Sequence, residues 1–306
     1  MEKLRQLVPI VLAKKYRRWV ALAVLALTFV LVVHFFTSHP EYLARLRTVP
    51  PSVIMLVVLL NIPAMASLAW AYAAMMRLCG KTLDVKENLL LTAYSSLANF
   101  FGPLQTGPGV RMVYLKARYN VRMRDFLMAT LIYYALFASF SAFFLFVGTR
   151  PWWQTLLAML AAVGLSAAVM WFFSRRRASS NDSQASQFRL SRGPLVALAV
   201  AVFLQLTCIV GYYYVELHAV NPQIQLSQVI SYSGAANFSL FVSITPDAVG
   251  FREAFLVFSQ QIHHVSTADI LNANIIDRGS YVIYLGLLFL FTLGVHARDR
   301  LKIKNL

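Results

Sequence analysis

Long apolar runs separated by short polar segments dominate the chain, and six runs approach the roughly 20 residues that a membrane-spanning helix requires. Tryptophan and tyrosine stand at the ends of several runs, as expected for side chains at a membrane–water interface. The pattern predicts an all-α integral membrane protein with full spans at about residues 19–36, 52–78, 126–148, 153–173, 194–215 and 275–295.

The composition supports this class, because 59% of the 306 residues are hydrophobic and only 13% are charged. A soluble domain carries about 25% charged residues. Lysine and arginine outnumber aspartate and glutamate by 28 to 12. Such an excess can mark a nucleic-acid-binding protein, but the basic loops of a membrane protein face the cytoplasm and its anionic lipids. We therefore expect membrane phospholipids as partners and no nucleic acid.

Two further apolar stretches, at about residues 88–104 and 228–246, are interrupted by glycine and proline, so hydropathy leaves their path open. A full crossing by the first stretch would export two basic loops, which the positive-inside rule disfavours. We therefore predict two re-entrant helical hairpins, with both termini and a flexible serine-rich loop at residues 174–193 in the cytoplasm. This topology places every lysine and arginine on the cytoplasmic side except Arg45, Arg47, Arg150, Arg252 and Arg278.

The two interrupted stretches share one sequence pattern, in elements at about residues 88–118 and 228–256. Each element contains Tyr-Ser-x-x-Ala-Asn-Phe, then a turn with proline, then Gly-x-Arg. Three full spans separate the copies, so the second is inverted in the membrane. Inverted repeats around discontinuous helices are typical of transporters, whose substrate site lies near the midplane. The predicted fold is thus a single polytopic membrane domain over residues 1–306, with about six full transmembrane helices plus two re-entrant helical hairpins related as an inverted repeat.

Glycine and proline at membrane depth require a buried or wet environment, because hydrocarbon offers no partner for freed backbone groups. Glycine permits a tight turn, and proline ends a helix. Asn99 and Asn237 each carry a donor and an acceptor, so each is expected to bond the freed groups at its own break.

Arg111 and Arg252 each follow a glycine at the start of the helix that leaves a break. A helix N-terminus and a guanidinium group both suit an anion such as a phosphate. Two such sites facing each other would hold an anionic headgroup. In the alternative, Arg111 is an interfacial charge and Arg252 pairs with Glu253 or Asp247.

Near the last span, Asp277 and Arg278 either neutralise each other, or Arg278 faces the cavity as a third anion contact. His263 and His264 are adjacent but lack a third ligand at metal-binding spacing, so we expect interfacial side chains there. We predict no metal, no cofactor and no catalytic residue.

Three segments, "ANFFGPLQTGPGVRMVYL", "TPDAVGFREAFL" and "IIDRGSYVIYLGLL", resemble conserved blocks of the lysylphosphatidylglycerol synthase transmembrane-region family, and the resemblance covers roughly Trp19 to Val295. This is the flippase-type membrane domain of the bacterial multiple peptide resistance factor, which also occurs as stand-alone proteins. The resemblance implies a multi-pass protein of the bacterial inner membrane that moves a phospholipid between leaflets.

The resemblance and the repeat together give a candidate set of groove and headgroup positions. These are Asn99, Pro103, Gly107, Pro108, Gly109, Arg111, Asn237, Pro246, Asp247, Gly250, Arg252, Glu253 and Arg278. Asp247 and Ala248 stand where the family suggests a more glycine-rich turn, which leaves the headgroup preference open. Because the chain stops at Leu306, we do not expect the aminoacyl-transferase domain of two-domain members or its lysyl transfer.

The sequence thus favours translocation of an anionic lipid between leaflets. No nucleotide-binding loop is present, so transport would be passive, driven by the membrane potential, or coupled to protons or to a partner. Three alternatives stay open: a membrane-embedded lipid-modifying enzyme, a small-anion permease, and a scaffold subunit of an envelope-synthesis complex. An envelope-lipid enzyme or a second copy of the chain would be the protein partner.

Overall fold

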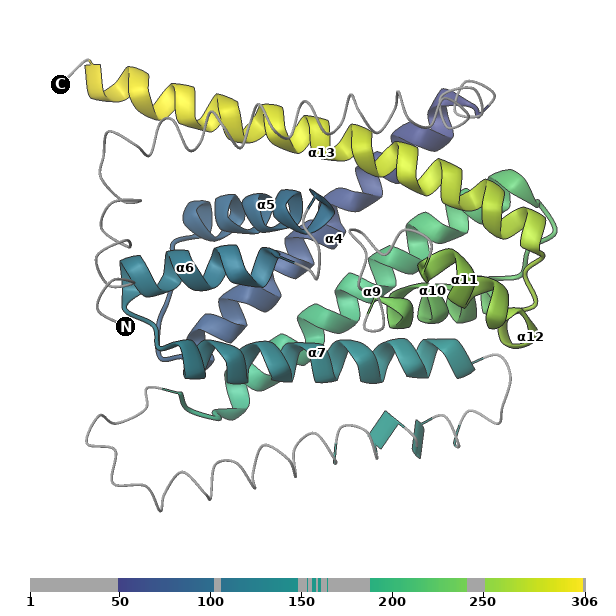
Figure 1. The fold of residues 1–306 in the computed structure, drawn as a ribbon, viewed down its shortest axis with the longest axis horizontal. Coiled ribbons are helices and arrows are strands. Elements are labelled where there is room, and N and C mark those ends of the chain that lie inside the picture. The colour runs from purple at the N-terminus through teal and green to yellow at the C-terminus, as the bar shows by residue number, and fades with distance from the viewer. Residues whose placement is uncertain are drawn as a thin grey trace. The chain divides into compact units, whose positions relative to one another are not determined.

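A computed structural model describes residues 49–101, 106–147, 188–240 and 251–304, with scattered positions between 153 and 164 (Figure 1). For Phe101 and residues 296–304 it describes the backbone alone. The predicted span at residues 19–36, and most of the span at residues 153–173 and of the loop at residues 174–193, lie outside the described residues. The described helices are α4 (Pro51–Leu78), α5 (Val85–Phe101), α6 (Gly107–Tyr119), α7 (Met123–Phe146), α9 (Arg192–Val220), α10 (Leu226–Ser239), α11 (Phe251–Phe258), α12 (Gln260–His263) and α13 (Thr267–Lys304).

Among the residues that the structure describes, four helices, α4, α7, α9 and α13, are long and apolar enough to cross a bilayer. They confirm the spans predicted at residues 52–78, 126–148, 194–215 and 275–295. Helix α13 begins earlier than predicted, at Thr267, because its first turns are too polar for hydropathy to include them. No strand occurs among the described residues, so the chain is an all-α membrane protein.

Helices α4 and α9 pack along each other. Both helices have a proline in their first turn, Pro51 in α4 and Pro194 in α9. A proline is tolerated there because the backbone N–H groups of the first turn have no intrahelical acceptor, so the missing N–H loses no hydrogen bond. Alanines on the two helices are fully or almost fully buried, among them Ala71, Ala74 and Ala201. Such small side chains let membrane helices approach closely.

Helices α5 and α6 form an antiparallel pair. Glu87, in the first turn of α5, accepts hydrogen bonds from the hydroxyls of Tyr114 and Tyr119 near the end of α6, and its carboxylate lies 2.7 Å from Nε of Arg118. Burial, together with the bond to Glu87, raises the pKa of Tyr114 to about 12, so its phenol stays protonated as the donor. The start of α5 and the end of α6 therefore lie next to each other, at the end of the hairpin opposite the break.

Helices α10, α11 and α12 form a second helical hairpin. The side-chain amide of Gln228, near the start of α10, donates to the carbonyl of His264, just after α12, at 3.0 Å. The rings of Tyr232 and His263 are 5.6 Å apart, and those of Phe238 and Phe255 are 6.1 Å apart. The chain therefore turns back at both predicted breaks, while entry of these hairpins into the membrane stays a prediction.

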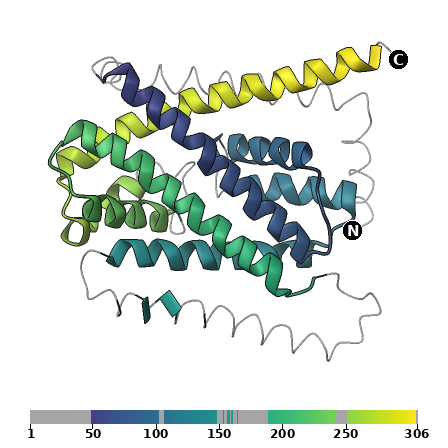
Figure 2. The same ribbon diagram turned by 180° about the vertical axis from the view of Figure 1, so that it is seen from behind.

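The contacts between helices follow the same pattern in both halves when α4 is matched with α9, α5 with α10, α6 with α11, and α7 with α13. Helix α5 packs against α4 and α13, as α10 packs against α9 and α7. Likewise α6 packs against α7, as α11 packs against α13, and the two hairpins lie on opposite sides of the α4–α9 pair (Figures 1 and 2). The described helices thus have the contact pattern expected of a two-fold internal repeat.

Candidate functional site

The first break is closed by bonds from its own helices. The backbone amide of Gly107 donates to Oδ1 of Asn99 at 2.6 Å, and the hydroxyl of Thr106 donates to the Ala98 carbonyl at 2.5 Å. A Cβ on Gly107 would lie 2.6 Å from the Ser95 carbonyl oxygen. The role predicted for Asn99 is confirmed, and the position of Gly107 requires glycine because the two helices approach so closely.

Arg111 lies on α6 just beyond this break, and it is buried, with 4% of its surface exposed. Its Nε donates to the Ser95 hydroxyl at 2.8 Å, and its guanidinium carbon lies 3.0 Å from the centre of the Tyr72 ring on α4. No described carboxylate forms an ion pair with Arg111. A cavity of about 10 Å³ adjoins the guanidinium, which is room for about one water molecule. The structure therefore holds a buried positive charge at the first break that no carboxylate of the described residues neutralises.

The second break is bounded by Ser239 and Phe251, and Pro246, Asp247 and Gly250 lie outside the described residues, as does Pro103 of the first break. Asn237, before the second break, donates from Nδ2 to the carbonyl and hydroxyl of Ser233 at 2.8 and 3.3 Å. This amide therefore bonds within its own helix. Pro108 is partly buried and Gly109 is exposed on the first turn of α6.

Charged residues on α11 pair with charged residues on α13. Nη2 of Arg252 pairs with the Asp277 carboxylate and donates to Oδ1 of Asn274 at 2.5 Å, while Nη1 lies 3.4 Å from the Tyr213 hydroxyl on α9. Nη2 of Arg278 lies 3.3 Å from Oε1 of Glu253. We expected Asp277 to be neutralised by its neighbour Arg278, and, in one alternative, Arg252 to pair with Glu253. Instead, Arg252 pairs with Asp277 and Arg278 pairs with Glu253, so both pairs join α11 to α13. The physical reason is that neighbouring residues on one helix point in different directions.

We call the residues at this junction the charge cluster. Besides the two ion pairs, it contains Glu216, which lies near the end of α9 and is fully buried. Neither carboxylate oxygen of Glu216 has a hydrogen-bond partner, and Nε of Arg252 and Nδ2 of Asn274 also lack one in the described structure. The cluster consists of Tyr213, Glu216, Arg252, Glu253, Asn274, Asp277 and Arg278.

His263 is buried rather than interfacial, which corrects the prediction for this residue. Its Nε2 lies 2.9 Å from the Leu256 carbonyl, and its Nδ1 accepts from the Val265 amide at 3.1 Å. These two contacts require the neutral ring with the proton on Nε2. Burial lowers the pKa of His263, which favours the same form.

Both hairpins reach the same part of α13. The Phe100 ring, at the end of α5, lies 5.7 Å from the Tyr281 ring of α13. Asp277 and Arg278, one turn earlier on α13, hold Arg252 and Glu253 at the start of α11. The two breaks therefore approach α13 within a single helical turn of each other.

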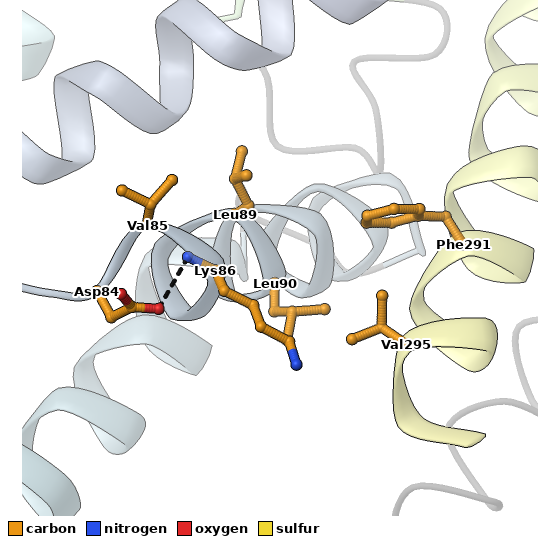
Figure 3. A pocket seen from close by; sticks show the side chains of 7 residues that line it. All are labelled: Asp84, Val85, Lys86, Leu89, Leu90, Phe291 and Val295. Carbon is orange, nitrogen blue, oxygen red and sulfur yellow. Dashed lines mark hydrogen bonds between the residues drawn. The ribbon is translucent and has the colours of Figure 1, made fainter. Parts of the chain in front are cut away.

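A groove of about 360 Å³ lies between the start of α5 and the later part of α13 (Figure 3). Phe291 and Val295 project from α13 toward Leu90 of α5, and Lys86 and Asp84 lie at the first turn of α5. The groove is lined by Asp84, Val85, Lys86, Leu89, Leu90, Phe291 and Val295. The groove lies at one end of the interface between α5 and α13, and the contact between Phe100 and Tyr281 lies at the other end. We call this interface the α5–α13 seam.

Sequence reasoning missed Tyr72, Tyr213, Glu216 and Asn274. One signal was available, because Tyr72 and Tyr213 are 141 residues apart, the same separation as Arg111 and Arg252. Each repeat arginine contacts the tyrosine of its own half, through the ring in one case and the hydroxyl in the other. The repeat therefore extends into α4 and α9 as an arginine–tyrosine contact.

Comparison with known proteins agrees with the resemblance of the three segments. A search of curated proteins gave no match to the chain. The sequence profile of one family, described as the lysylphosphatidylglycerol synthase TM region, matches residues 18–289. This match includes both helical hairpins and the charge cluster, so the chain belongs to the lysylphosphatidylglycerol synthase TM region family.

Proposed function

We propose that this protein moves an anionic phospholipid between the leaflets of the bacterial inner membrane, through a polar path between its two helical hairpins. Its family is named for the membrane region of a lipid synthase, which supports a role connected with membrane lipids. The observation that carries the finer proposal is Arg111, a buried cation that no described carboxylate neutralises. A phosphate diester supplies the missing negative charge.

The dimensions of the hairpins support their insertion partway into the bilayer. Helix α5 has 17 residues and α10 has 14. At 1.5 Å per residue they extend about 26 and 21 Å, less than the hydrocarbon core of about 30 Å. Each is followed by a break and a helix that returns beside it. Together with the exchangeable contacts of the two halves, these lengths favour an inverted pair of re-entrant elements.

The groove between α5 and α13 supports a route for the lipid tails. Its walls at Leu89, Leu90 and Phe291 are apolar, so acyl chains can remain in an apolar environment beside it. The α5–α13 seam leads from this groove toward the break that precedes Arg111. In this mechanism the headgroup travels through the protein while the acyl chains stay in lipid.

Access to Arg111 requires a conformational change. The guanidinium is covered by Tyr72 and bonded to Ser95, and the adjoining cavity of about 10 Å³ is far too small for a phosphate. The described conformation therefore corresponds to a closed state of the proposed cycle. Separation of α6 from α4 exposes the cation to a headgroup, and the return of Tyr72 releases it.

The direct test uses purified protein in liposomes with fluorescent phosphatidylglycerol or phosphatidylcholine and a membrane-impermeant quencher. We expect the protein to make inner-leaflet phosphatidylglycerol accessible to the quencher faster than in empty vesicles. Arg111→Gln should slow this step about 10- to 150-fold, since a hydrogen bond to a charged group contributes about 1.5–3 kcal/mol. Arg111→Lys keeps the charge but loses the planar contact, so it should retain part of the rate.

Arg118→Gln is the matched control, because it removes an exposed positive charge from the same helix. It should leave translocation unchanged. Equal rates in Arg111→Gln and Arg118→Gln would refute the role of Arg111, and a lack of acceleration for every lipid would refute translocation by the isolated protein. Inhibition by soluble phosphate equal to that by short-chain phosphatidylglycerol would instead indicate a small-anion permease.

A further inference from the structure

Glu216 is the feature of the described structure that the proposed lipid path does not use. Its side chain is fully buried, and neither carboxylate oxygen has a hydrogen-bond partner. An ionised carboxylate in such a place is strongly unfavourable, because it loses its hydration without gaining a partner. A carboxylic acid that keeps its proton avoids most of this cost. The burial therefore favours the protonated acid in the described conformation.

The charges around Glu216 lead to the same conclusion. The charge cluster holds three carboxyl groups, on Glu216, Glu253 and Asp277, but only two guanidinium groups, on Arg252 and Arg278. The two ion pairs between α11 and α13 engage Asp277 and Glu253. With Glu216 ionised the cluster carries one net negative charge, and with Glu216 protonated it is neutral. A neutral cluster is the stable one in a buried site.

The unused hydrogen-bonding groups of the cluster are complementary. Nε of Arg252 and Nδ2 of Asn274 are buried donors without an acceptor, and Glu216 offers two buried acceptors without a donor. Arg252 and Asp277 are also the two charged groups that act on Glu216. The spare donor of Arg252 and the spare acceptors of Glu216 thus belong to the same buried cluster. Arg252 therefore has two available carboxylate partners, of which the described conformation uses one.

We propose that Glu216 is a proton-binding site, and that its proton controls whether Arg252 is committed to Asp277 or shared between two carboxylates. When Glu216 is protonated, Arg252 stays with Asp277 and the cluster is neutral. When the proton leaves for water, the carboxylate attracts Arg252 and loosens the contact between α11 and α13. This inference rests on the proposed lipid translocation and adds to it a coupled ion.

The consequence for transport follows from charge. A proton on Glu216 removes one negative charge from the site that an anionic headgroup must pass. Binding of the proton therefore favours binding of the headgroup, and binding of the headgroup favours binding of the proton. A phosphate diester and one proton together carry no net charge. The structure thus favours movement of the anionic lipid with a proton.

The other ionisable neighbours of Glu216 are phenols. Tyr212 and Tyr213 lie on its own helix, and Tyr232 faces it from α10. From α4 and α7, which also pack against α9, no described ionisable group acts on Glu216. Phenols stay protonated in this environment, so the change of charge belongs to Glu216 and the Arg252–Asp277 pair.

Infrared difference spectroscopy of the purified protein tests the proton directly, without any transport. The carbonyl stretch of a protonated, buried carboxylic acid should be present in the wild-type protein, shift in heavy water and disappear as the pH is raised. Glu216→Gln should remove this band, and Glu216→Asp should displace it, which covers the case in which one variant folds poorly. Asp269→Asn is the matched control, because Asp269 accepts a hydrogen bond from Asn221 at 3.1 Å and lies outside the cluster.

The proposal is overturned if the wild-type protein shows no such band, or if the band survives in Glu216→Gln. In liposomes, a pH gradient should change the rate of phosphatidylglycerol translocation by the wild type and by Asp269→Asn, but not by Glu216→Gln. A Glu216-specific band without any lipid movement would support the proton site and reject the proposed function. Lipid movement that ignores pH, with no band, would support translocation and reject the proton site.

Discussion

Gly107 and Gly109 offer a comparison of two glycine-to-alanine changes on the same helical turn. A Cβ at Gly107 would lie 2.5 Å from Oδ1 of Asn99 and 2.6 Å from the Ser95 carbonyl oxygen, whereas a Cβ at Gly109 would meet nothing within 4 Å. Both positions have ordinary helical backbone. The pair therefore separates close approach of the helices from the general effect of glycine in a helix.

The expected cost of Gly107→Ala has two parts. Overpacking costs about 1–3 kcal/mol, and displacement of Asn99 strands the buried Gly107 amide, which costs about 1–3 kcal/mol. The sum is about 2–6 kcal/mol of unfolding free energy. Gly109→Ala should instead gain about 0.5–1 kcal/mol, because alanine loses less backbone entropy in a helix. At about 2 °C per kcal/mol for a chain of this size, the two variants should differ by several degrees in unfolding temperature.

Cys79 provides the assay. Its thiol is buried, and burial raises its pKa to about 12, so a thiol-reactive fluorogenic dye should label it only on unfolding. The measurement uses a Cys208→Ala background, since Cys208 is partly exposed. A lower unfolding temperature for Gly107→Ala and an equal or higher one for Gly109→Ala support the close contact at the break. Equal unfolding temperatures, or a larger loss for Gly109→Ala, would refute it.

Three further predictions follow from the second hairpin. Arg252→Ala should destabilise by about 3–5 kcal/mol because it leaves the buried Asp277 carboxylate without its partner. Asp277→Ala should cost less, because Glu216 then offers Arg252 a second carboxylate, and the double variant should cost less than the sum of the two; additive losses in thermal unfolding would contradict the pair. The pKa of His263 is lowered in the folded protein, so as the pH falls His263 takes up a proton in the unfolded chain, near the usual pKa of about 6.5, before it does so in the folded one. Stability should therefore fall as the pH drops below that value. His263→Gln should flatten the dependence of unfolding temperature on pH. Gly234→Ala would place a Cβ 2.6 Å from Cα of Leu145, whereas Gly286 has open space, so the first should lower the unfolding temperature and Gly286→Ala should not; equal effects would argue against the contact of α10 with α7.

The spans and the breaks were predictable because each depends on residues close together in the sequence. Hydropathy located α4, α7 and α9 nearly to their ends, since some 20 consecutive apolar residues leave little choice of structure. Glycine and proline located the first break between α5 and α6, and Asn99 was predictable as its closing side chain, because its partner is only eight residues away.

The partners of the buried charges were not predictable from the sequence. Arg252 and Asp277 are 25 residues apart, and their pairing depends on how α11 packs against α13. Adjacency suggested Asp277 with Arg278, yet two neighbours on a helix diverge, so each finds its partner on the other helix. Glu216 escaped notice because a single acid near the end of an apolar run is normally an interfacial residue; its burial results from the packing of α10 and α13 around it.

The two halves of the molecule share one arginine–tyrosine contact but place it in opposite electrostatic surroundings. In the second half Arg252 lies among acids, and Glu216 and Glu253 stand 141 residues after Met75 and Met112. Met75 lines the small cavity beside Arg111, so the first half has an apolar residue where the second half has a titratable one. An uncompensated cation favours an anion, whereas a balanced cluster with one spare carboxyl favours a proton. The repeat thus supplies the two unlike sites that coupling a lipid to a proton requires.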